Sequence, residues 1–148
     1  MIYNPTGGEL MKFHFDVDGD NFTSAGQASV SVKKSLGQIG IDPAVIRRVA
    51  IAMYEGEINM VIHADGGSAD IYIYPDCIKI ALTDHGPGIP DVEKAMQEGY
   101  STAPDNIRSL GFGAGMGLPN MKRYTDEMRI ETELGVGTIV EMVIRLPE

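Results

Sequence analysis

The chain has 148 residues and a formal net charge of −9, which fits one acidic domain with its own core. Its basic residues form only isolated pairs, so the sequence lacks the basic face of a nucleic-acid-binding protein. The sequence has one cysteine, so no internal disulfide can form. It has no apolar run of about 18 residues and no signal-peptide pattern, so we expect a cytoplasmic protein without a membrane span.

The first part of the chain predicts a strand followed by a helix. Residues 1–10 are interpreted as a loose lead-in. Phe13 and Phe15 then alternate with polar neighbours, which is typical of a strand. Apolar residues recur every three or four positions over 22–38, which predicts an amphipathic helix that ends at Gly40.

A second, longer helix is predicted directly after it. Asp42 is a good N-cap and Pro43 suits the first helical position, and the helix runs to about Ala64, before Asp65-Gly66-Gly67. Most of this helix is apolar all round, which is typical of a buried helix. Polar side chains in such a helix need partners, and here they are Glu55, Glu57 and Asn59.

The rest of the chain predicts two hairpins with helices between them. The predicted order is strands 69–74 and 77–83, helix 91–97, an irregular segment 99–117, helix 118–124, and strands 128–132 and 137–146. We therefore expect an α+β fold, a two-layer α/β sandwich whose mixed, mostly antiparallel sheet is covered by helices on one face. Residues 1–148 are interpreted as a single domain.

Glu55 and Asn59 are the first residues along the chain that could take part in a reaction or bind a ligand. Four positions apart on the long helix, they lie on the same face, one turn from each other. An Asn carbonyl suits Mg²⁺, which takes few protein ligands and keeps water and phosphate oxygens, and a Glu can act as a general base. Such a pair is also common at a solvated helix edge, but the apolar neighbours Ile51, Ala52 and Ile58 favour a functional site.

Asp84-His85-Gly86-Pro87-Gly88 follows a predicted strand. The sequence fits a Gly-Pro turn in which Asp84 binds its own backbone. It also fits an Asp that accepts a hydrogen bond from the exocyclic amine of adenine, with Gly86 and Gly88 allowing the backbone to approach the base. His85 is interpreted as incidental.

Glycines at alternate positions precede the helix at 118–124. They are Gly111, Gly113, Gly115 and Gly117. Backbone N–H groups in such a loop, followed by a helix N-terminus, can wrap phosphates, and 99–117 is long enough for a lid. A flexible loop is the alternative. The segment is not a P-loop, because no Gly-Lys-Ser/Thr follows, and no strand leads into it as a Rossmann fingerprint requires.

Together these segments resemble a known superfamily. EGEINMVIHA resembles the N box, DHGPG the first glycine box and GFGAGMG the second glycine box of the GHKL (Bergerat) ATP-binding proteins, which include gyrase, Hsp90, histidine kinases and anti-sigma-factor serine kinases. The resemblance covers about residues 13–146. Only about 40 residues precede the long helix, which suits the anti-sigma kinases, and EKAMQEGYSTA and GAGMGLPNMKRYTDE resemble the switch kinases of stressosome-type modules.

The resemblance implies a role for each matching residue. Glu55 would activate the substrate hydroxyl as the catalytic base, and Asn59 would ligate Mg²⁺ at the phosphates of ATP or ADP. Asp84 would read adenine, with Gly86 and Gly88 shaping its pocket. The glycines of the second box would line the phosphates as the lid closes. Thr138 would either support the adenine side through water or touch a phosphate.

The sequence departs from the switch kinases at two places. APDNIRSLGF intervenes between GYST and the glycine box. Arg108 within it is either a γ-phosphate charge stabiliser or an exposed loop arginine. The His-Gly that is common after the N box is His63-Ala64 here, and His63 is interpreted as structural.

The expected function is therefore that of an Mg-ATP-dependent protein serine/threonine kinase acting on a STAS-domain anti-sigma antagonist. The first alternative is a nucleotide-responsive anti-sigma module that sequesters a partner such as a sigma factor, with ATP and ADP selecting different lid conformations. The second is a slow free-standing ATPase. A homodimer formed through an apolar patch on the first helix is a further expectation.

Overall fold

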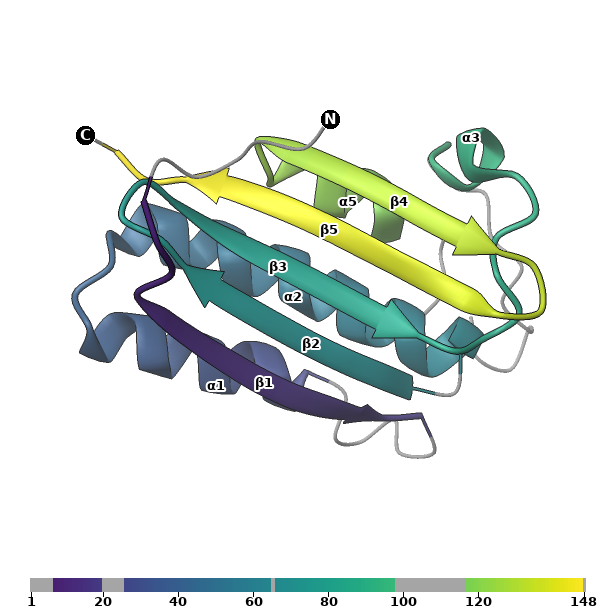
Figure 1. Ribbon diagram of the computed structural model, residues 1–148, viewed down its shortest axis with the longest axis horizontal. Helices are drawn as coiled ribbons and strands as arrows, with labels where there is room; N and C mark the ends of the chain where they lie inside the picture. Colours follow the sequence, from purple (N-terminus) through teal and green to yellow (C-terminus); the bar gives the residue numbers. More distant parts are fainter. Residues whose placement is uncertain (1–6, 20–25, 65, 98–116, 148) are drawn as a thin grey trace.

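The computed structural model describes residues 7–19, 26–64, 66–97 and 117–147, and they form two layers (Figure 1). One layer is a five-stranded sheet. The other is made of helices on one face of that sheet: α1 (Gln27–Gln38), α2 (Pro43–Ala64) and α5 (Gly117–Arg123). A fourth, short helix, α3 (Val92–Ala95), lies near one end of the sheet.

The sheet follows the order β1-β2-β3-β5-β4. Its strands are β1 (Met11–Asp18), β2 (Gly66–Ile73), β3 (Cys77–Asp84), β4 (Glu127–Glu133) and β5 (Gly137–Arg145). All four pairings among these strands are antiparallel. The predicted α+β sandwich is confirmed, and in the described part its sheet is entirely antiparallel rather than mixed.

The core lies between the sheet and the helices. Alternate residues of the strands point into it, as the period of a pleated strand requires, and Ile71, Ile80 and Met142 are at most 1% exposed. Helices α1 and α2 close the core with residues such as Leu36 and Met53, both fully buried. Within the described residues, no helix is long and apolar enough to cross a membrane.

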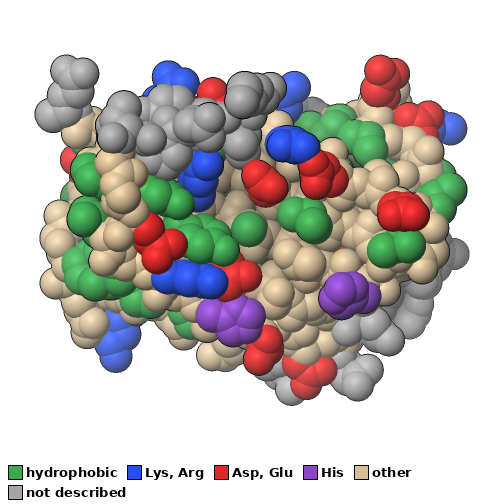
Figure 2. All heavy atoms as spheres, viewed as in Figure 1, with side chains coloured by type: hydrophobic (Ala, Val, Ile, Leu, Met, Phe, Trp, Pro, Cys, Tyr) green, Lys and Arg blue, Asp and Glu red, His purple; other side chains and the backbone are tan. Residues whose placement is uncertain are grey.

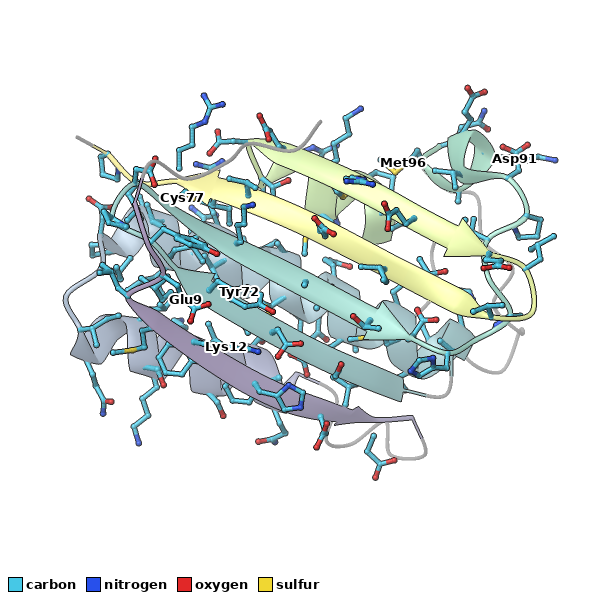
Figure 3. All side chains as sticks on the ribbon, viewed as in Figure 1. Glu9, Lys12, Tyr72, Cys77, Asp91 and Met96 are labelled. Carbon is cyan, nitrogen blue, oxygen red and sulfur yellow. The ribbon has the colours of Figure 1, made fainter. Side chains whose placement is uncertain are left out.

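The opposite face of the sheet carries charged side chains, with hydrophobic ones among them (Figure 2). Figure 2 shows this face with acidic, basic and histidine side chains interspersed. On β1 and β2, His14 binds Asp70 at 2.7 Å and Asp16 at 3.1 Å, and the Lys12 ammonium lies 5.1 Å from the centre of the Tyr72 ring (Figure 3). The helices therefore cover only one face of the sheet, as the sequence predicts.

Helix α2 begins where the sequence predicts. The Asp42 carboxylate accepts the backbone N–H of Ala44 at 2.8 Å, which is the local bond expected of an Asp that caps a helix start. Helix α1 begins at Gln27, after its N-cap Gly26, rather than at the predicted residue 22, and residues 22–25 lie outside the described part. Helix α3 is shorter than the predicted 91–97, and Asp91 caps it by accepting the N–H of Lys94 at 3.1 Å.

Helix α2 ends at Ala64, as predicted, but the next strand begins earlier than the predicted residue 69, because Gly66 and Gly67 form the start of β2. They pair with Asp18 and Val17 on the neighbouring strand. A Cβ at Gly66 would collide with the Val17 carbonyl, and one at Gly67 with the Thr83 carbonyl. Glycine is therefore needed here because backbones approach closely on both sides, a constraint that the sequence pattern alone does not distinguish from a turn.

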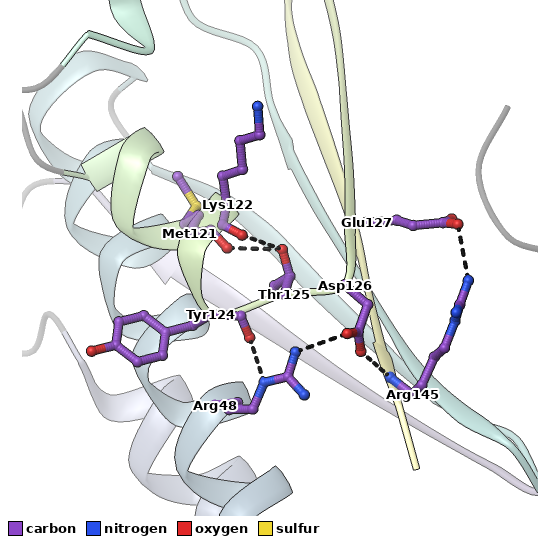
Figure 4. Close-up of polar contacts among 8 residues, drawn as sticks. All are labelled: Arg48, Met121, Lys122, Tyr124, Thr125, Asp126, Glu127 and Arg145. Carbon is purple, nitrogen blue, oxygen red and sulfur yellow. Dashed lines mark hydrogen bonds and ion pairs between the residues drawn. The ribbon is translucent and has the colours of Figure 1, made fainter. Parts of the chain in front are cut away.

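A network of polar contacts anchors the C-terminal end of α5 (Figure 4). Arg48 of α2 donates through Nε to the Tyr124 carbonyl at 3.0 Å and pairs with Asp126 at 3.3 Å. Thr125 donates its hydroxyl to the Met121 carbonyl at 2.9 Å, and Asp126 accepts the backbone N–H of Arg145 at 2.7 Å. These contacts join α5 to α2 and to the beginning of the last hairpin.

Candidate functional site

A pocket lies where the C-terminal half of α2 meets the ends of β3 and α5 and the start of β5. Its walls combine a few polar side chains with apolar ones, as ligand pockets usually do. The lining residues are Gly56, Asn59, Met60, His63, Ala64, Leu82, Asp84, Pro87, Gly88, Ile89, Met121, Thr138 and Val140. Four site residues predicted from the sequence, Asn59, Asp84, Gly88 and Thr138, therefore meet in one pocket.

Asp84 ends β3 and is held by backbone groups from two sides. Its Oδ1 accepts the N–H of Gly86 at 2.9 Å and the N–H of Thr138 at 3.2 Å, across the pairing of β3 with β5. The bond to Gly86 is the local turn contact that the sequence predicts. Because both donors bind Oδ1, Oδ2 is the oxygen through which Asp84 can accept a hydrogen bond from a ligand amine.

Gly86 and Gly88 are required by the protein's own packing. A Cβ at Gly86 would lie 2.6 Å from the Cβ of Ala64, at the end of α2. Gly88 has a φ of 83°, and a Cβ there would lie 2.8 Å from the Glu133 carbonyl oxygen. These glycines hold the loop after Asp84 between the end of α2 and the β4–β5 hairpin.

Thr138 lies beside Asp84 rather than beside Glu55. It is 6% exposed, and its hydroxyl shares a hydrogen bond of 2.9 Å with that of Thr132. Its backbone N–H is one of the two donors to Asp84. Of the two roles predicted for Thr138, support of the Asp84 side of the pocket therefore fits this placement better than contact with a phosphate.

Glu55, Asn59 and Gly117 come together where α5 begins. A Cβ built at Gly117 would lie 3.8 Å from Oε2 of Glu55 and 3.9 Å from Oδ1 of Asn59. Both side chains are partly buried and face the same end of α5, as their spacing on α2 predicts. A carboxylate and an amide oxygen are thus next to the first residue of a helix.

Asn120 is a polar neighbour that the sequence motifs did not identify. It lies one turn after Gly117 on α5 and donates Nδ2 to Oε1 of Glu55 at 3.2 Å. The helical spacing could have indicated Asn120. Residues three apart on a helix lie on one face, so Asn120 faces α2 as Gly117 does. The motif alone could not show which side chain α5 would meet.

His63 lines the pocket, whereas His85 is exposed. Burial lowers the pKa of His63 from its ordinary value, although the nearby Asp84 carboxylate opposes this shift. The neutral imidazole is therefore favoured over the protonated one.

The residues that could hold a metal are few. Among the residues that the structure describes, no three His, Cys, Asp or Glu side chains form a group suited to a metal ion. Mg²⁺ does not need such a cluster, since it often binds one or two protein oxygens together with phosphates and water. Asn59 Oδ1 in the pocket, near Glu55 and the start of α5, fits that mode of binding.

Several predicted residues lie outside the described residues. They are Arg108, Gly111, Gly113 and Gly115. Of the second glycine box, the structure describes only Gly117, which begins α5. The apolar wall residues Met60, Leu82 and Met121 were not predicted either, because in the sequence they resemble core residues.

Comparison with known proteins gives a consistent result. A family model for the histidine kinase-like ATPase domain matches residues 21–144. The serine/threonine-protein kinase RsbT of Bacillus subtilis is 33% identical over 127 residues, which cover 83% of this chain and 87% of that protein. The anti-sigma F factor of Clostridium novyi is 32% identical over 145 residues, which cover 94% of this chain and 96% of that protein.

A second anti-sigma F factor, from Caldanaerobacter subterraneus, is 36% identical over 109 residues, which cover 69% of this chain and 73% of that protein. Among solved structures, the RsbU and RsbW domains of a Mycobacterium tuberculosis protein match with a TM-score of 0.63 and 17% identity. That match covers 93% of this chain and 33% of the other chain, and it supports the fold alone.

Proposed function

The chain belongs to the histidine kinase-like ATPase domain family, and on this basis we propose that it is a protein serine/threonine kinase that uses Mg-ATP. The observation that carries the proposal is that one pocket is lined by both Asn59 and Asp84, with Glu55 close by at the start of α5. Membership of an ATPase family implies ATP binding. The roles of single residues are part of the proposal, and their placement supports them.

Adenine would bind at the Asp84 end. Oδ1 of Asp84 is held by Gly86 and Thr138, which leaves Oδ2 to accept the exocyclic N–H of the base. Met60, Leu82 and Val140 would give the ring an apolar surface. Guanine carries a carbonyl where adenine carries this amine, so the carboxylate would disfavour it.

The phosphates would lie toward the start of α5. Asn59 would supply a carbonyl oxygen to Mg²⁺, whose charge would neutralise the phosphate oxygens. Because Gly117 has no side chain, it would leave room for the phosphates at the first residue of α5. The remaining glycines of the second box and Arg108 keep their predicted roles in a lid and in charge stabilisation.

Glu55 would act as the general base. Its carboxylate would take the proton of a Ser or Thr hydroxyl while the hydroxyl oxygen forms a bond to the γ-phosphorus. The bond between that phosphorus and the β–γ bridging oxygen breaks, and ADP leaves with the electron pair. The products are ADP and a phosphorylated Ser or Thr residue.

The partner is proposed to be a protein of a sigma-factor regulatory module, in the cytoplasm. The names of the relatives, a serine/threonine-protein kinase and anti-sigma factors, support a protein partner of this kind. A STAS-domain anti-sigma antagonist is the proposed substrate. The anti-sigma relatives also favour a second function, sequestration of a sigma factor in a nucleotide-dependent way.

Calorimetry with ADP and ATP, with and without Mg²⁺, tests the nucleotide site. We expect Asp84→Asn to abolish binding of both nucleotides and Asn59→Ala to remove the gain that Mg²⁺ gives. Asp16→Asn, on the exposed face of β1, is the control and should bind as the wild type does. Normal binding by Asp84→Asn would refute the adenine site.

Transfer of γ-phosphate from Mg-ATP to purified STAS-domain proteins separates the two functions. A kinase should lose transfer in Glu55→Ala while it still binds nucleotide and partner. If the wild type binds a sigma factor in an ATP-dependent way but phosphorylates no STAS protein, the sequestering function is correct instead.

A further inference from the structure

The Asn120 side chain has a defined orientation between two charged groups. Its Nδ2 donates to Oε1 of Glu55 at 3.2 Å, and its Oδ1 accepts Nη1 of Arg123 at 3.5 Å. The reverse orientation would set the amide oxygen against a carboxylate and the amide NH₂ against a guanidinium. The surrounding charges therefore fix which end of Asn120 meets Glu55.

Helix α5 is in turn held against one face of α2 at two points. Arg48 and Glu55 are seven residues apart on α2, which is two turns, so they lie on the same face. Arg48 binds the Tyr124 carbonyl just after α5, and Glu55 binds Asn120 within it. Asn120 is thus carried by a helix whose position is fixed relative to the helix that bears Glu55.

Close packing between these two points reinforces the arrangement. Met121 is 1% exposed, and a Cβ at Gly56 would lie 3.5 Å from its sulfur. The same Cβ would collide with a methyl group of Leu82. Gly56 therefore lets β3 and α5 approach α2 at the turn next to Glu55.

We propose that Asn120 is a positioning residue for the general base. By binding Oε1 it orients the Glu55 carboxylate so that Oε2 lies at the start of α5, near Oδ1 of Asn59. Oε2 is then the oxygen that receives the proton of the substrate hydroxyl. This inference rests on the proposed role of Glu55 as base.

The test compares Asn120→Asp and Asn120→Ala with Lys122→Ala, which removes an exposed side chain from the same helix. The readouts are ADP formation from Mg-ATP, with and without a STAS-domain protein, and calorimetric nucleotide binding. We expect kcat to fall about tenfold or more in Asn120→Ala, since a hydrogen bond to a charged group is lost. Asn120→Asp has nearly the same shape but sets two carboxylates together, so its kcat should fall further, while KM and nucleotide affinity stay within about twofold for both variants.

Combining the Asn120 variants with Glu55→Gln tests whether Asn120 acts through the base. If Asn120 acts only through the base, Asn120→Ala should cause no further loss in a Glu55→Gln background. A Glu55→Gln variant that lacks turnover, beside Asn120 variants with normal kcat, would overturn the positioning role alone. Full turnover in Glu55→Gln would overturn the base and the positioning role together. A fall in nucleotide affinity equal to the fall in kcat would mean that Asn120 is merely structural.

Discussion

The carboxylate of Glu57 on α2 accepts the backbone N–H of Ser29 at 2.6 Å, so one helix provides the N-terminal cap of another. The same carboxylate accepts the N–H groups of Gly26 and Ala28 at 2.9 and 3.2 Å. Glu57 is only 2% exposed. A buried carboxylate at a helix N-terminus is stabilised both by these donors and by the helix dipole.

Glu57→Ala should therefore destabilise the fold strongly. It leaves three buried N–H groups without their acceptor and opens a cavity, and we expect a loss of about 3 kcal/mol in the free energy of unfolding. Urea unfolding measures this loss. Glu93→Ala on the exposed surface of α3 is the control, and an equal midpoint for the two variants would contradict the capping role.

The stability should depend on pH through His14. Hydrogen bonds to Asp70 and then Asp16 raise the pKa of His14 above its ordinary 6.5. A raised folded pKa means that the folded state holds the proton more tightly. This contribution is fully present below pH 6.5 and is lost as the pH rises through the folded pKa. NMR titration of the imidazole should show the raised pKa in the wild type and a value closer to 6.5 in Asp70→Asn, and an unchanged titration in Asp70→Asn would exclude this origin.

Gly88→Ala and Gly135→Ala separate backbone strain from steric collision. Their φ angles are 83° and 79°, so both substitutions should cost about 1 kcal/mol through the left-handed backbone. Only Gly88 has the Glu133 carbonyl in the way, at 2.8 Å from the Cβ, whereas Gly135 has open space. Thermal unfolding should show a larger loss for Gly88→Ala, with weaker ADP binding because Gly88 lines the pocket; equal losses would mean that the loop simply moves aside.

Gly117→Ala tests the proposed phosphate end of the pocket without disturbing the fold. The added methyl would stand 3.8 Å from Glu55 and 3.9 Å from Asn59, which is ordinary contact. It would nevertheless occupy space between the proposed base and the proposed Mg²⁺ ligand, so we expect Mg-ATP to bind about tenfold more weakly, a cost of about 1.4 kcal/mol. Gly37→Ala in α1, where the added methyl meets nothing within 4 Å, is the control for a glycine-to-alanine change in a helix. Equal affinity for Mg-ATP in the two variants would place the phosphates elsewhere.

The sequence predicted the features that depend on local pattern. The Asp42 cap, the buried α2 and the strand alternation were correct, since each depends on residues close together in the chain. The family resemblance was confirmed by the match over residues 21–144. The roles of Glu55 and Asn59 stay predictions, although the structure brings both to the start of α5.

What the sequence could not supply is the identity of long-range partners. Glu57 was expected to need a partner, but nothing local to it indicates the start of α1. Asn120 contacts Glu55 only because α5 packs on α2, and Gly66 belongs to a strand because it pairs with Asp18 of β1. In each case the constraint comes from a backbone or side chain tens of residues away.

The place of β5 between β3 and β4 has a consequence for the synthesis of the protein. Asp84 meets Thr138 only after the last strand has left the ribosome and entered the middle of the sheet. A nascent chain that stops earlier lacks one wall of the pocket and both ladders that β5 forms, with β3 and with β4. A fold without β5 would therefore bind nucleotide more weakly than the complete fold, and through mass action nucleotide would favour the complete fold over partly folded molecules.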